Sequence, residues 1–217
     1  MKNTHKLLLA LSATAPLPAA VITAANGSAA GSAGYTWNVS LNSADRDNTT
    51  FVGSVGSWAW EDRDLNEDPA LGGNNNIGWR HQSDWIAVTL TESSRVTIQM
   101  ARFDPSADLK LFPSFTIYEN LTSITNRHFY ENDRDLSWDP ALLYQGHLAN
   151  STSGTVTMTL DLPAGDYSLV LGGNSTSEAS SVPVNYRSSI STAPIPEPST
   201  PLLTLLASLA LLKRRQR

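Results

Sequence analysis

Apolar residues alternate with polar ones in several short runs between residues 35 and 192, and this period of two constrains the fold more than any other feature. The clearest runs place their apolar residues at Tyr35, Trp37, Val39 and Leu41, at Val96, Ile98 and Met100, and at Val156, Met158 and Leu160. Side chains two residues apart in a strand share one face, so each run would bury one face and expose the other. Turn residues separate the runs, and no helical period is evident between the two ends of the chain. We therefore expect an all-β domain over residues 35–192, folded as an antiparallel β-sandwich.

Length and composition limit the remaining possibilities. A chain of 217 residues favours one domain or two small ones. The absence of cysteine excludes a disulfide scaffold, a thiolate nucleophile and a cysteine-ligated metal. Six of the fifteen basic residues lie in the two tails, which leaves nine bases against nineteen acids in between, or a charge of about −10. This acidic middle argues against nucleic acid as a partner, because phosphate binding needs a basic surface.

The N-terminal segment has the composition of an export signal. Two lysines precede an apolar run at residues 7–11, and small residues then continue to Ala25 and Ala30. Basic residues, a short apolar core and small residues in this order are typical of a secretory signal peptide. We predict a signal peptide over residues 1–30, and the sequence does not choose between cleavage near Ala25 and cleavage near Ala30.

The C-terminal segment has three features in a fixed order. Pro196, Glu197 and Pro198 come first, residues 199–212 are uncharged, and a basic cluster ends the chain. A comfortable membrane span needs about 20 residues, so this shorter stretch predicts a short hydrophobic helix that serves as a transient anchor. The basic end would stay on the cytoplasmic side and the main domain would lie outside.

These three features together resemble the PEP-CTERM sorting signal, over residues 193–217. The motif residues are Pro196, Glu197 and Pro198, with Arg214 and Arg215 as the basic stop. The resemblance implies cutting by an exosortase-type enzyme in the inner membrane of a Gram-negative bacterium that makes exopolysaccharide. The alternative interpretation is an ordinary tail anchor.

A second resemblance lies in the central domain. Residues 162–173 read Leu-Pro-Ala-Gly-Asp-Tyr-Ser-Leu-Val-Leu-Gly-Gly, and a strand follows near residues 185–187. This segment resembles the penultimate hairpin of bacterial pre-peptidase C-terminal domains. It implies a jelly-roll-like sandwich that acts as a binding or accessory module.

Two acidic loops hold the polar chemistry of the domain, at residues 58–76 and 131–139. In the first loop, Asp62, Asp64 and Asn66 have the D-x-D-x-N spacing that directs alternate oxygens toward a hard cation. The rest of an EF-hand is absent, so calcium is a candidate structural ion. The alternative is a solvated acidic loop.

Three tryptophans of these polar loops, Trp58, Trp60 and Trp138, are candidates for carbohydrate binding. A flat aromatic ring can stack on the C–H face of a sugar while neighbouring polar groups bind its hydroxyls. The alternative is that each ring covers an open end of the sandwich.

Catalysis receives the least support. Many carboxylates could form the acid pair of a glycoside hydrolase, but their number makes any one pair unremarkable. Gly-x-Ser-x-Gly, His-Glu-x-x-His and a phosphate-binding glycine loop are all absent. We expect a non-enzymatic surface or matrix protein first, a carbohydrate-binding module second, and a matrix glycoside hydrolase last.

Overall fold

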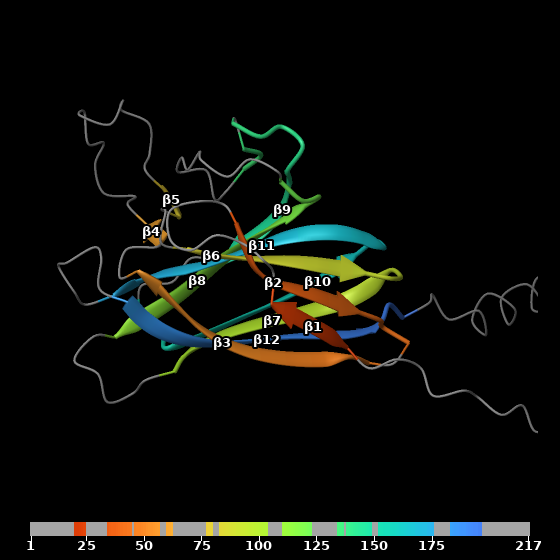
Figure 1. The fold of residues 1–217 in the computed structure, drawn as a ribbon, viewed down its shortest axis with the longest axis horizontal. Helices are drawn as coiled ribbons and strands as arrows, with labels where there is room; N and C mark the ends of the chain where they lie inside the picture. Colours follow the sequence, from red (N-terminus) through yellow and green to blue (C-terminus); the bar gives the residue numbers. More distant parts are fainter. Residues whose placement is uncertain are drawn as a thin grey trace, which may run out of the picture.

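The computed structural model describes residues 20–24, 34–44, 46–56, 60–62, 77–79, 83–103, 110–122, 134–136, 138–148, 152–175 and 183–196. These residues form twelve strands and no helix (Figure 1). The strands are β1 (Val21–Ala24), β2 (Tyr35–Leu41), β3 (Asn48–Gly56), β4 (Trp60–Asp62), β5 (Ile77–Trp79), β6 (Asp84–Leu90), β7 (Ser94–Arg102), β8 (Leu111–Glu119), β9 (Leu143–Leu148), β10 (Thr155–Leu162), β11 (Gly165–Ser175) and β12 (Pro183–Pro194).

Two sheets pack face to face, which confirms the predicted all-β sandwich (Figure 1). The larger sheet has the order β1-β2-β6-β11-β8-β9 and the smaller one has the order β10-β7-β12-β3, while β4 and β5 form a separate pair. One detail of the prediction is wrong, because β2 and β6 run parallel. Between these two strands the chain crosses to the smaller sheet as β3 and then returns, so it re-enters the larger sheet in the same direction.

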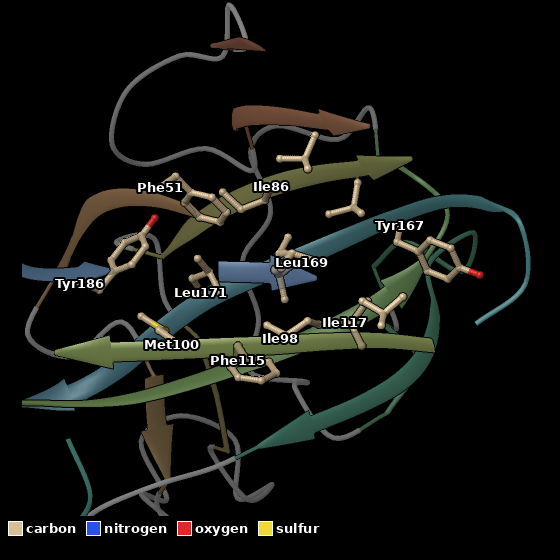
Figure 2. Packing of buried hydrophobic residues seen from close by; sticks show 14 of the residues in the cluster. Phe51, Ile86, Ile98, Met100, Phe115, Ile117, Tyr167, Leu169, Leu171 and Tyr186 are labelled. Atoms are coloured by element: carbon tan, nitrogen blue, oxygen red, sulfur yellow. The ribbon is translucent and has the colours of Figure 1, made fainter. Parts of the chain in front are cut away.

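The main core is the apolar layer between the two sheets (Figure 2). The smaller sheet contributes alternate residues of its strands, including Phe51, Ile98, Met100 and Tyr186. The larger sheet contributes residues that include Ile86, Phe115, Ile117, Leu169 and Leu171. The alternation seen in the sequence therefore places the core of the smaller sheet correctly.

The middle of the larger sheet is buried on both faces. Its outward-facing Trp85, Tyr118 and Val170 form a second apolar cluster with Leu136 from the second acidic loop and Leu142 from the turn after it. The expectation that each strand exposes one face is therefore wrong for β6, β8 and β11. The reason is that Leu136, Trp138 and Leu142 cover this face and remove it from water.

A sharp corner, rather than a hairpin, connects β10 to β11. The two strands lie in different sheets, so the expectation of a hairpin at residues 162–173 is wrong. The Tyr167 hydroxyl donates a hydrogen bond of 2.8 Å to the carbonyl oxygen of Pro163, four residues earlier. Leu162 and Tyr167 both point into the core from opposite sheets, and this shared burial fixes the corner.

The strand β1 lies inside the segment predicted as the signal peptide. It pairs with β2 at the edge of the larger sheet, and Ala20 and Ile22 pack against the core. If the chain is cut near Ala25 or Ala30, β1 leaves with the leader and β2 becomes the edge strand.

The predicted hydrophobic helix at residues 199–212 lies outside the described residues. Within the part of the chain that is described, no helix has the length and apolar character needed to cross a membrane.

Candidate functional site

The first acidic loop is described only around the pair β4–β5. Trp60 lies opposite Trp79 in this pair, Asp62 lies opposite Ile77, and β4 and β5 both lie against β11. Trp58, Asp64 and Asn66 fall outside the described residues. The structure thus places the start of the D-x-D-x-N run on the same short strand as Trp60. The described residues contain no group of three acidic or histidine side chains that could hold a metal ion.

The second acidic loop uses its carboxylates to hold the fold. Asp139 is buried, and its carboxylate accepts a hydrogen bond from the hydroxyl of Thr122 and one of 3.2 Å from the backbone N–H of Ala141. The carboxylate of Asp135 accepts a hydrogen bond of 2.6 Å from the backbone N–H of Tyr144. Both carboxylates therefore satisfy backbone or buried polar groups of the segment that covers the larger sheet.

Trp138 does not present an open ring face. Its side chain is 8% exposed and packs edge-on against Trp85, with ring centroids 6.4 Å apart and an interplanar angle of 61°. The hypothesis that this ring stacks on a sugar needs correction, because burial leaves no face for a ligand. Trp138 takes the alternative role of covering the sandwich, and this leaves Trp58 and Trp60 as candidate sugar-binding rings.

A polar pair, the half-buried Asp84 and the buried Tyr186, joins the two sheets at one end of the sandwich. The Tyr186 hydroxyl on β12 donates a hydrogen bond of 2.7 Å to the Oδ2 atom of Asp84 on β6. The Thr36 hydroxyl on β2 donates a longer one of 3.4 Å to Oδ1 of the same carboxylate. Asp84 is the first residue of β6, and Tyr186 lies near the start of β12. Figure 2 shows Tyr186 at the margin of the core beside Phe51.

Gly53 on β3 leaves the space in which this pair sits. Gly53 lies directly opposite Tyr186 in the strand register. A Cβ atom at this position would lie 2.6 Å from the Tyr186 hydroxyl oxygen and 2.7 Å from Oδ2 of Asp84. The missing side chain is therefore a requirement of the hydrogen bond between the sheets.

Burial dominates the electrostatics of the pair. It raises the pKa of Asp84 above its ordinary value, and the hydrogen bonds from Tyr186 and Thr36 oppose that rise to a smaller extent. Burial, together with the nearby Asp84 charge, raises the pKa of Tyr186 well above its ordinary value. The tyrosine therefore stays protonated and donates to the carboxylate. A perturbed carboxyl group beneath a polar loop marks a candidate site, but its contacts here hold the two sheets together.

Sequence reasoning missed this pair. Asp84 and Tyr186 are 102 residues apart, and no local pattern connects them. The signal available was an acidic residue that opens a buried strand, together with a tyrosine whose hydroxyl would need a partner when buried.

The described chain belongs to the class of all-β sandwich proteins. No protein-family model matches it, and no curated protein matches it. Among solved structures it is similar to CorA, a surface-associated copper-binding protein of Methylomicrobium album BG8, with 15% identity, a TM-score of 0.46, and coverage of 71% of this chain and 97% of that one.

Two other solved structures show a weaker likeness. The secreted protein MopE of Methylococcus capsulatus has 13% identity and a TM-score of 0.43, over 70% of this chain and 86% of that one. The pre-peptidase C-terminal domain of a Bacillus anthracis collagenase has 10% identity and a TM-score of 0.35, over 70% and 91%. These sequence identities and TM-scores are too low for a neighbour's function to be assigned to this chain.

Replacing Asp84 with Asn tests the role of the buried carboxyl. Because its pKa is raised in the folded state, wild-type stability from this group is greatest below the unfolded pKa and falls as pH rises through the folded pKa. Asn keeps an acceptor for Tyr186 and does not titrate. We expect the variant to gain stability relative to wild type as pH rises from about 4 to about 8, measured by urea unfolding. A difference that is constant with pH would contradict the prediction.

Replacing Gly53 with Ala tests the space around the pair. The added methyl group overlaps both oxygen atoms, so we expect a loss of about 1–3 kcal/mol in unfolding free energy. Gly146→Ala is the matched control, because its Cβ would meet its nearest atoms at 3.6–3.7 Å, an ordinary contact distance. Equal effects of the two substitutions in thermal or urea unfolding would rule out a special requirement for glycine at position 53.

Proposed function

We propose that this chain is an exported, non-enzymatic surface or extracellular-matrix protein whose β-sandwich associates with exopolysaccharide. Its C-terminal segment would hold it transiently in the inner membrane, and an exosortase-type enzyme would release it at the Pro196-Glu197-Pro198 motif, with Arg214 and Arg215 as the basic stop. The signal-peptide and sorting-signal features at the two ends of the sequence support export and sorting. The single β-sandwich between them supports one functional domain.

The observation that carries the non-enzymatic part of the proposal is how the described carboxylates are used. Their oxygens accept hydrogen bonds from turn backbones, from strand hydroxyls and from one arginine. The acceptors are Asp47 after β2, Glu92 between β6 and β7, Asp135 and Asp139 before β9, Asp161 and Asp166 on β10 and β11, and Asp84 between the sheets, and Glu119 on β8 accepts from the Gln145 amide. These contacts give the acidic residues roles in the fold, as expected for a scaffold or binding domain.

Protein mapping of the surface fraction from the native host tests the sorting part. We expect the mature chain to lack residues 213–217, because the basic stop is left behind when the anchor is removed. Replacing Pro196, Glu197 and Pro198 with alanine should retain the tail, whereas Pro201→Ala, in the same lead-in but outside the motif, should not. Wild-type surface protein that keeps residues 213–217 would contradict the proposal. The N-terminal residue found in the same experiment shows whether β1 remains in the mature chain.

A second candidate function is a calcium-dependent carbohydrate-binding module. One observation favours it, because Trp60 and Asp62 lie on β4, so a candidate sugar-binding residue and the first candidate calcium ligand share one short strand. Asp64 and Asn66 would complete the ion site, and Trp58 would add a second ring.

Co-sedimentation of the protein with host extracellular polysaccharide, with calcium and with a chelator, tests this candidate. We expect the double variant Asp62→Asn with Asp64→Asn to lose the calcium-dependent part of binding, since both changes remove a charged oxygen ligand. Glu61→Gln is the control for the loss of one negative charge on β4, because Glu61 lies outside the D-x-D-x-N positions. Wild-type binding that is indifferent to the chelator would exclude the calcium site.

A further inference from the structure

The outer face of the smaller sheet carries a regular array of uncharged polar side chains. Strand register places eight of them in two parallel rows that cross all four strands. We call these the hydroxyl array; one row is Thr159, Thr97, Ser191 and Asn48, and the next is Thr157, Gln99, Ser189 and Thr50. All eight are exposed or half-exposed, whereas Leu136, Trp138 and Leu142 cover the corresponding face of the larger sheet. In Figure 1, β3 and β12 lie on the side of the sandwich opposite to β4, β5 and β9.

Hydrogen bonds within the array fix the directions of four of its eight groups. The Thr97 and Thr159 hydroxyls are 2.9 Å apart, and Nε2 of Gln99 donates a hydrogen bond of 3.2 Å to the Thr157 hydroxyl. A hydroxyl that uses one lone pair or its hydrogen in this way keeps further capacity for a ligand. Neighbouring groups are spaced by about 4.8 Å across strands and about 6.7 Å along them. The sheet thus presents pre-oriented hydrogen-bonding groups on a lattice that requires little ordering when a ligand binds.

The array is electrically neutral in a domain that is strongly acidic. No ionisable side chain stands in either row, although the middle of the chain carries nine bases against nineteen acids. At one border Arg95 and Asp161 cancel each other in an ion pair of 2.7 Å. At the other border Arg187 lies 4.8 Å above the ring of Phe103, which is 43% exposed, and Val52, opposite Arg187, is 49% exposed.

We propose that the hydroxyl array binds an extended, neutral polysaccharide. Sugar hydroxyls match the donors and acceptors of the two rows, and a sugar residue is comparable in length to the spacing between strands. Phe103 and Val52 offer apolar contacts for sugar C–H groups at the border. The two rows themselves carry no charge for an anionic ligand to pair with, and the acidic remainder of the domain disfavours a polyanion. This inference rests on the proposed association with polysaccharide and names its binding face and ligand class.

The test measures co-sedimentation of the purified full-length mature protein with host extracellular polysaccharide, separated by anion exchange into neutral and acidic fractions. We expect binding to the neutral fraction that is unchanged at about 0.5 M salt, because no ion pairs are involved. In the double variant Thr97→Val with Thr159→Val, two hydroxyls become methyl groups of the same shape, and affinity should fall about tenfold. Thr89→Val is the matched control, since it removes an exposed, hydrogen-bonded strand hydroxyl from the larger sheet.

The outcomes separate this inference from the function on which it rests. Wild-type protein that binds neither fraction overturns the proposed association, and the hydroxyl array with it. Two results would overturn only the proposal that the hydroxyl array binds a neutral polysaccharide. One is wild-type protein that prefers the acidic fraction, and the other is a double variant that binds as well as Thr89→Val. Melting temperatures of all variants check the fold, and Thr157→Val gives a second reading if the double variant fails to fold.

Discussion

The apolar layer between the two sheets is the constraint on which the rest of this structure depends. Each strand must give alternate side chains to that layer, and the remaining residues are forced onto the outer faces. The smaller sheet meets this demand with threonine, serine, asparagine and glutamine outside. The larger sheet places Trp85, Tyr118 and Val170 outside, so it needs a second cover. The segment around Trp138 supplies that cover, and its buried Asp139 caps the turn that carries it.

The same demand places the hydrogen bond between Asp84 and Tyr186 at the margin of the core. Asp84 begins β6 and Tyr186 lies near the start of β12, so their hydrogen bond joins the sheets where the apolar layer ends. The carboxylate is costly to bury, as its raised pKa shows, and the tyrosine hydroxyl offsets part of that cost. Gly53 is needed there because a side chain would occupy the volume of both oxygens.

Much of the fold could be predicted from periodicity, because a period of two survives in single strands such as β7 and β10. The partners of each strand could not be predicted. β10 and β11 are separated by only Pro163 and Ala164 yet lie in different sheets, and β2 and β6 run parallel through a crossover. The burial of Trp138 could not be predicted either, because the sequence of an acidic loop does not indicate that the loop packs on a sheet. The pairing of Asp84 with Tyr186 depends on tertiary contact alone.

The two proposed ligand-binding regions differ in what holds their groups in place. Asp62 lies on β4 and is related to Asp64 and Asn66 by sequence spacing, so a calcium site there would rely on the ion to draw the three side-chain oxygens together. The eight groups of the hydroxyl array are held by the backbone ladder of four strands, all of which also contribute to the same core. Calcium is therefore not required for the array to keep its geometry. A polysaccharide that binds in the presence of a chelator points to the smaller sheet, whereas a calcium requirement points to the loop at the end of the sandwich.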